Sequence, residues 1–225
     1  MSWHWKPFKV IVAQDQAGPS RMSILNVLMT PDRAFIAVDT LAQDAVTGEK
    51  SEGAKLLLIP QHNIVVAGRG SGQFFLRLYH LCLEASFRRA FTIEQIMREA
   101  GPVMDKLWPN YLDAARVAEM NLDQLQSEFV VVGWSQTQQR IVGSAYSKSD
   151  VGSPARVVEL VGGIAAPGEP LRDIPDSFEP GAIRAAGARQ VAYLNAEQGR
   201  EVAGGRILAA FLSRGEVIVR DLGAI

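Results

Sequence analysis

The sequence has a single cysteine, Cys82, and only three histidines, His4, His62 and His80, among its 225 residues. One cysteine excludes an internal disulfide framework and a cysteine-based structural zinc site, and it fits a reducing compartment. The histidines are too far apart in sequence to form a recognisable metal motif. A surplus of basic charge is also missing, since 23 Lys and Arg stand against 24 Asp and Glu. Nucleic acid is therefore disfavoured as the main partner, because phosphate binding requires such a surplus.

Long apolar runs are missing as well. No stretch approaches the roughly 18 apolar residues that a membrane-spanning helix needs. Near the N-terminus the apolar run Val10–Ala13 is shorter than the core of a signal peptide, which takes about 7–15 residues. We therefore expect a cytoplasmic protein with no membrane partner. The 48% hydrophobic content is that of a globular chain, which at this length can bury a full core.

The first 21 residues differ in composition from those that follow. They contain two tryptophans, two prolines and the polar stretch 14–20, a composition typical of a leader or linker. A regular pattern begins at Met22. We therefore divide the chain into residues 1–22, as a leader, a propeptide or a misassigned start, and a domain formed by residues 23–225.

Strands are expected mostly as adjacent pairs. The pairs are 24–29 with 34–38, 55–59 with 64–67, 129–134 with 140–146 and 206–212 with 216–222, with a further strand at 156–161. Two helices, one around 74–85 and one capped by Thr92, follow the second pair, and a third spans about 180–195. We expect Pro102 to kink the second helix and Trp108-Pro109 to interrupt it. Residues 40–53 and 162–180 are expected to be loops.

This order of elements indicates the fold class. Strands that arrive as hairpins, instead of alternating with helices, favour an α+β fold with antiparallel sheets over a doubly wound parallel sheet. Both early hairpins are nearly continuous apolar runs, which indicates that their sheets are covered on both faces. Two antiparallel sheets with helices outside each would satisfy that pattern.

Several motifs together resemble a proteasome-type β-subunit of the N-terminal-nucleophile (Ntn) hydrolase superfamily, and the resemblance covers most of the chain after residue 22. They are Ser23-Ile-Leu-Asn-Val-Leu, Asp32-Arg-Ala-Phe-Ile-Ala-Val-Asp39-Thr40, Ala54-Lys55-Leu-Leu-Leu-Ile-Pro, Val65-Val-Ala-Gly68-Arg-Gly70-Ser-Gly72, Val132-Gly133-Trp134 and Gly204-Gly205-Arg-Ile-Leu. The resemblance implies a four-layer α-β-β-α sandwich. It also implies assembly into rings, and so a homo-oligomer.

The same resemblance implies a catalytic site. In this family the nucleophile is the first residue of the mature chain, an Asp ends the second strand and a Lys opens the third. Counted from Ser23 without gaps, these positions fall on Asp39 and Lys55. The implied activity is hydrolysis of an amide bond in a peptide or small amide substrate by Ser23, without a cofactor or metal. A backbone N–H of the turn Gly68–Gly72, with Gly70 as the favoured donor, would hold the oxyanion.

The chemistry of these residues agrees with that role. A serine hydroxyl is a weak nucleophile, and a free α-amino group titrates near pH 8, so the amine can take the hydroxyl proton. A neighbouring Lys would lower both pKa values, and Asp39 would hold that Lys in place. Ser23 has a free amine only if residues 1–22 are absent, either because translation starts at Met22 and that Met is removed, or because the chain cleaves itself.

Two departures from the family pattern support a different interpretation. The resemblance places an Asp and a Ser just before Gly204-Gly205, where this chain has Arg200 and Ala203. It also places a Ser-Gly-Ser near residues 162–165, where no serine occurs. The alternative is therefore a catalytically inactive proteasome-like subunit that serves as an assembly or interaction scaffold.

A third hypothesis is a nucleotide-binding module, in which Gly68–Gly72 would cradle a phosphate at the start of a helix. A second helix follows where a dinucleotide fold needs another parallel strand, so this hypothesis is the weakest. Cys82 lies on the apolar face of its helix and is interpreted as a packing residue.

Overall fold

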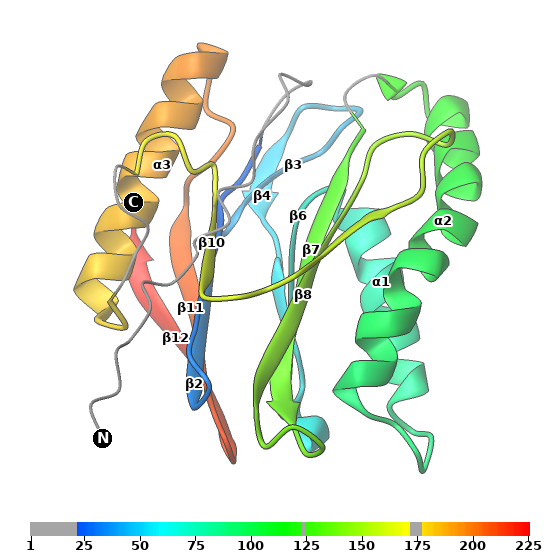
Figure 1. Ribbon diagram of the computed structural model, residues 1–225. Coiled ribbons are helices and arrows are strands. Elements are labelled where there is room, and N and C mark those ends of the chain that lie inside the picture. Colours follow the sequence, from blue (N-terminus) through cyan, green and yellow to red (C-terminus); the bar gives the residue numbers. More distant parts are fainter. Residues whose placement is uncertain (1–21, 123–124, 172–176) are drawn as a thin grey trace.

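The computed structural model describes residues 22–122, 125–171 and 177–225. Two five-stranded antiparallel sheets lie face to face, with α1 and α2 outside one sheet and α3 outside the other (Figure 1). The expected α+β fold with an α-β-β-α sandwich is confirmed. The expected leader lies outside the described residues, except for Met22.

The first sheet has the strand order β10-β1-β2-β11-β12 and carries α3 on its outer face. Its members are β1 (Leu25–Met29), β2 (Arg33–Asp39), β10 (Gly163–Ala166), β11 (Arg206–Ser213), β12 (Glu216–Ala224) and α3 (Pro180–Gln198). The predicted hairpins β1–β2 and β11–β12 are confirmed. β10 was expected to be loop. It is a strand because it pairs with β1 through residues that are 135 (Leu28↔Gly163) to 141 (Leu25↔Ala166) positions apart in the sequence, and so no local pattern marks it.

The second sheet has the strand order β5-β6-β7-β8-β9. Its strands are β5 (Leu56–Ile59), β6 (Ile64–Gly70), β7 (Ser127–Ser135), β8 (Arg140–Lys148) and β9 (Arg156–Glu159), and a 3-10 turn (Pro60–His62) joins β5 to β6. The predicted hairpins β5–β6 and β7–β8 are confirmed. The expected loop 40–53 instead contains a small two-stranded sheet of β3 (Leu41–Gln43) and β4 (Lys50–Glu52).

Both helices outside the second sheet begin at a capping hydroxyl, and the predicted Thr92 cap is confirmed. α1 (Gly72–Ala85) follows Ser71, whose hydroxyl accepts the N–H of Phe74. α2 (Ile93–Val117) follows Thr92, which caps it through Gln95 N–H. The expected interruption at Trp108-Pro109 is wrong, since α2 runs through both prolines. Packing holds the turn together despite the lost backbone hydrogen bonds, because Trp108 is fully buried there.

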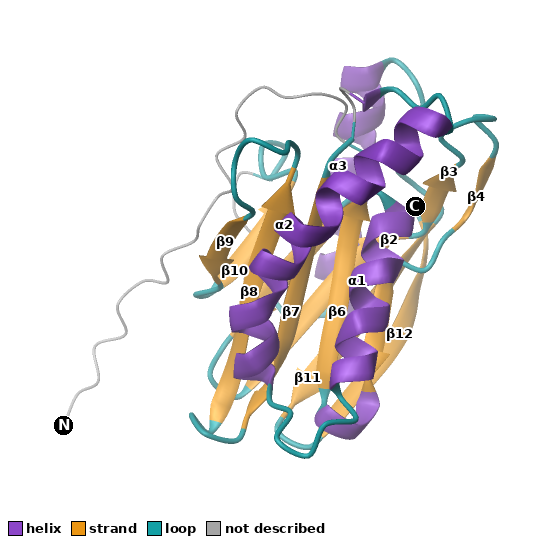
Figure 2. Ribbon diagram, turned by 90° about the vertical axis from the view of Figure 1, so that its right-hand side faces the viewer, coloured by secondary structure: helices purple, strands orange, loops and turns teal. Residues whose placement is uncertain are grey.

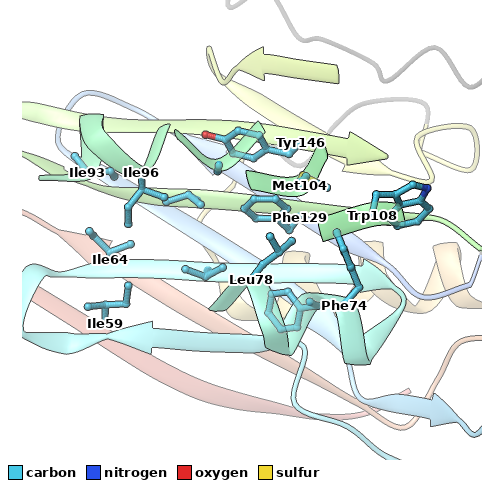
Figure 3. Packing of buried hydrophobic residues seen from close by; sticks show 14 of the residues in the cluster. Ile59, Ile64, Phe74, Leu78, Ile93, Ile96, Met104, Trp108, Phe129 and Tyr146 are labelled. Carbon is cyan, nitrogen blue, oxygen red and sulfur yellow. The ribbon is translucent and has the colours of Figure 1, made fainter. Parts of the chain in front are cut away.

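An aromatic cluster fills the layer between α1, α2 and the second sheet (Figure 3). Phe74 of α1 meets Trp108 of α2 edge-on with ring centroids 4.9 Å apart, and Phe129 stacks on Tyr146 at 4.5 Å. A second, aliphatic core lies between the two sheets, formed by alternate residues of the same strands. Strands with an apolar core on each face explain why the hairpins are continuous apolar runs.

Cys82 lies on α1 against the aromatic cluster, as predicted for a packing residue. Burial raises the pKa of its thiol to about 11 from an ordinary value of 9.0. At pH 8 the thiolate fraction is therefore about 100-fold below that of an unshifted thiol. We expect iodoacetamide to alkylate Cys82 about 100-fold more slowly than free cysteine at pH 8, with a tenfold gain per pH unit until pH 11. Alkylation at the rate of free cysteine would contradict this burial.

Candidate active site

Three predicted site residues meet at one end of the sandwich. Ser23 lies two residues before β1, Asp39 is the last residue of β2, and Lys55 directly precedes β5. The Lys55 ammonium donates to Ser23 Oγ at 2.7 Å and to Asp39 Oδ1 at 3.0 Å. The spacing of 16 and 32 residues thus becomes a hydrogen-bonded group of a hydroxyl, an ammonium and a carboxylate.

Asp39 forms the base of this group and is fully buried. Its Oδ1 also accepts the N–H of Ile24 at 3.0 Å, and its Oδ2 accepts the N–H of Gly204 at 3.1 Å. A buried carboxylate with an ion pair and two backbone donors keeps its charge satisfied. Asp39 therefore fixes three separate segments around Ser23: the start of β1, Lys55, and the loop before β11.

Lys55 is mostly enclosed, with 12% of its side chain exposed. Its ammonium has a third acceptor, the carbonyl of Leu41 at the start of β3. Burial lowers the pKa of Lys55 from its ordinary value, while the charge of Asp39 opposes that shift. A lysine held in this way keeps a proton donor directed at the serine oxygen, and releases the proton more easily than a lysine in water.

Ser23 itself has an unusual backbone conformation. Its φ is +73°, in the left-handed region that residues with a side chain seldom occupy. Ser23 is buried, with a relative exposure of 5%. Its hydroxyl oxygen accepts a hydrogen bond from Lys55. In this chain the nitrogen of Ser23 is the amide nitrogen of the Met22–Ser23 peptide bond. Such strain persists only where surrounding contacts hold it, and it is frequent at functional sites.

Gly70 ends β6 and lines the same pocket as Ser23 and Lys55. Its φ is +87°, and a Cβ at this position would come within 2.3 Å of the carbonyl oxygen of Gln126. Only glycine fits, because both the dihedral angle and the neighbouring backbone exclude a side chain. Gly70 thus lines the same pocket as Ser23 and Lys55, and its role as the oxyanion donor stays a prediction.

The pocket at this group has a volume of about 180 Å³. Its walls are largely apolar, and the apolar residues are Met22, Leu41, Ala42, Ala54, Phe75, Leu76 and Val202. Gln43, Ser71, Arg69 and Glu201 add polar and charged groups to the lining. The fully buried Asp39 lies behind Lys55 and does not line the space. A small, mostly apolar cleft beside one polar group is the usual form of a site for a small molecule or a side chain.

Sequence reasoning missed the residues that hold the loop before β11. Asn195 of α3 accepts the N–H groups of Val202 and Ala203 and donates to the carbonyl of Ala203 at 3.0 Å. Thr40 accepts the N–H of Arg206 at 2.8 Å. Support that the family pattern places within this loop therefore comes here from β2 and α3. The one signal in the sequence is the polar Thr40 next to Asp39 at the end of a strand.

Arg200, which stands in the region where the family pattern has an Asp, points away from the nucleophile. It donates to Gln43 of β3 at 2.8 Å, and its neighbour Glu201 pairs with Lys50 of β4 at 2.6 Å. Both contacts connect the β3–β4 hairpin to the loop before β11. Gln43 and Glu201 also line the pocket, so these two pairs hold part of its wall.

Two features are missing from the described part of the chain. Residues 22–122, 125–171 and 177–225 contain no group of three or more His, Cys, Asp or Glu placed to hold a metal ion. Within the same ranges no helix is long and apolar enough to cross a membrane.

Comparisons with known proteins bear on the fold. No protein-family model matches the sequence, and no curated protein matches it. Among solved structures, Anbu from Hyphomicrobium sp. strain MC1 matches with a TM-score of 0.57 over 89% of this chain and 88% of that one, at 13% sequence identity. At this identity the likeness concerns the backbone alone. The chain therefore has a proteasome-like fold of the Ntn sandwich type, as the sequence motifs predicted.

Proposed function

We propose that the protein is an amide-bond hydrolase whose nucleophile is Ser23, exposed as an N-terminal residue by removal of residues 1–22. The observation that carries this proposal is the ammonium of Lys55, which contacts Ser23 Oγ at 2.7 Å and Asp39 Oδ1 at 3.0 Å beside a pocket. An isolated lysine at the start of a strand would extend into solvent. Here it is enclosed and shared between a hydroxyl and a carboxylate.

The reaction follows from these groups. The free α-amine of Ser23 takes the hydroxyl proton while Oγ attacks the carbonyl carbon of the amide, and Gly70 N–H stabilises the oxyanion. The tetrahedral intermediate collapses, the leaving amine takes the proton from the α-ammonium, and an ester to Ser23 remains. Water, deprotonated by the same amine, then attacks the ester carbonyl, Ser23 Oγ leaves and takes the proton from the α-ammonium, and the acid is released. Lys55 lowers the pKa of the hydroxyl throughout by its charge.

The apolar walls of the pocket favour a substrate with an apolar side chain next to the cleaved bond, in a peptide or a small amide. The proteasome-like fold also supports assembly of several copies, and we propose a homo-oligomeric ring. These assignments need neither a cofactor nor a metal.

The alternative is an inactive proteasome-like subunit that acts as a scaffold. The observation favouring it is the set of contacts made by the loop before β11, where Arg200 and Glu201 hold the β3–β4 hairpin and supply no group to Ser23. A scaffold would keep the fold and assembly while its Ser23 stayed unreactive.

Two measurements separate these functions. Intact mass of the protein from its native source is expected to show a chain that begins at Ser23, and a chain that keeps Met1 would contradict the enzyme. A peptide β-lactone, whose ring opens on attack, is then expected to add its full mass to Ser23. Ser23→Ala should abolish the adduct, while Ser71→Ala, at the edge of the same pocket, should retain it. A chain that begins at Ser23 and resists the lactone would favour the scaffold.

A further inference from the structure

The outer face of α1 carries an exposed stripe that no described segment covers. In Figure 2 the helix lies beside α2 at the front of the molecule, outside the second sheet. Its inner face is buried through Phe74, Phe75 and Leu78. The residues on its outer face recur every three or four positions, and they are Gln73, Leu76, Arg77, His80, Leu83, Glu84 and, in the turn after the helix, Phe87. We name these seven residues the α1 stripe.

Large apolar side chains are unusually exposed in the α1 stripe. Leu76 is 49% exposed and Phe87 82% exposed, and Leu83 between them is partly exposed. At 100° per residue Leu76 and Leu83 fall on one flank of the stripe, separated from the charged residues, and Phe87 lies in the turn that follows the helix. Exposed apolar residues that gather in a row indicate an interaction surface, whereas scattered ones do not.

Charged residues occupy the other flank. Arg77 and Glu84 lie on the same side of the helix, on either side of His80, about 10 Å apart along the axis. The Glu84 carboxylate contacts His80 at 2.9 Å, with both side chains more than half exposed. Arg77 has no acidic partner in the part of the chain that the structure describes. One unpaired cation and one loosely held anion therefore lie on a single flank.

This arrangement is complementary to itself. A twofold axis between His80 of one copy and His80 of the other reverses the direction of the helix in the second copy. It keeps each flank of the stripe on its own side. Arg77 of one copy then lies across from Glu84 of the other, twice. On the opposite flank Leu76 lies across from Leu83, also twice. A shift of one helical turn separates both Arg77–Glu84 pairs and in one direction places Arg77 across from His80, and a shift of about two turns in that direction places Arg77 across from Arg77.

We propose that the α1 stripe is a contact between two copies of this chain, packed antiparallel about a twofold axis at His80. The occupant is a second copy because the apolar and charged flanks match themselves in one register. Such an isologous contact closes after two copies and cannot form a ring of more than two. It is therefore distinct from the contacts of the proposed ring and does not depend on hydrolysis by Ser23.

Charge reversal tests the register directly. Arg77→Glu places two pairs of like charge across the twofold axis, and Glu84→Arg does the same with the opposite sign. We expect either variant of the full chain to dissociate at a concentration on the order of tenfold higher than wild type, because attraction becomes repulsion at both pairs. Sedimentation velocity over a concentration series measures this change as halving of the particle mass, whether the particle is a pair of chains or a pair of rings.

Rescue by mixing distinguishes this contact from any other. When the Arg77→Glu and Glu84→Arg proteins are mixed, every cross-contact is again between opposite charges, and the wild-type mass should return. The double variant should also return it. Arg189→Glu, an exposed reversal on α3 in the opposite layer, should leave the mass unchanged. Wild-type mass in both single variants, failure of the mixture to restore it, or a wild-type protein that stays monomeric would each overturn the proposal.

Discussion

Lys55→Met, in a chain that begins at Ser23, is expected to lower the rate of lactone labelling by about 10²–10⁴-fold. The reason is the loss of the charge 2.7 Å from Ser23 Oγ, which in the wild type lowers the pKa of the hydroxyl. Methionine keeps the length of the side chain and its fit to the pocket wall but has no proton to donate. The rate is measured from the mass-shifted fraction over time, at a temperature where circular dichroism shows both proteins folded.

The same substitution is expected to lower the free energy of unfolding by about 3 kcal/mol, because it leaves the fully buried Asp39 without its ion partner. Lys50→Met is the matched control. Lys50 also pairs with a carboxylate, that of Glu201, but both side chains are about half exposed, so its loss should cost less than about 1 kcal/mol. Equal effects of the two substitutions on unfolding in urea would contradict the burial of the Lys55–Asp39 pair.

Trp108→Ala should have the largest effect on stability, about 3–5 kcal/mol of unfolding free energy. Trp108 is fully buried and contacts Phe74 of α1 and Tyr111 of its own helix, with centroids 4.9 Å and 5.4 Å away. Its removal leaves a cavity where α2 also carries Pro109 and lacks a backbone hydrogen bond. Urea unfolding followed by circular dichroism measures the loss.

Two controls interpret that result. Val117→Ala, in the last turn of the same helix, removes an 86% exposed side chain and should change stability by less than about 0.5 kcal/mol. Trp108→Phe should cost less stability than Trp108→Ala. The indole N–H has no hydrogen-bond partner in the described structure, so its removal leaves no acceptor without a donor. A loss below about 1 kcal/mol for Trp108→Ala would mean that packing at Trp108 does not hold α2 together.

The β3–β4 hairpin shows where local patterns stopped being informative. Residues 40–53 are polar and were predicted to be loop, yet Leu41–Gln43 pairs with Lys50–Glu52. Leu41 donates to Gly204, and Arg200 and Glu201 contact the hairpin from the far end of the chain. Contacts over more than 150 residues leave no trace in a window of ten. The continuity of α2 through Trp108-Pro109 was missed for a similar reason, since its support comes from α1.

The sequence by itself determined the hairpins and the Thr92 cap, and its resemblance to a known family named Ser23, Asp39 and Lys55 as candidate site residues. Strand hydrophobicity, cap hydroxyls and fixed spacing are local properties, and Ser23, Asp39 and Lys55 lie at strand ends that the pattern marks. Only the tertiary structure decided what surrounds them: Asp39 buried behind Lys55, Asn195 reaching from α3 to the loop before β11, and Gly70 lining the pocket. These contacts join segments that are far apart in the chain. The burial and the hydrogen bonds between such segments exist only once both sheets have packed.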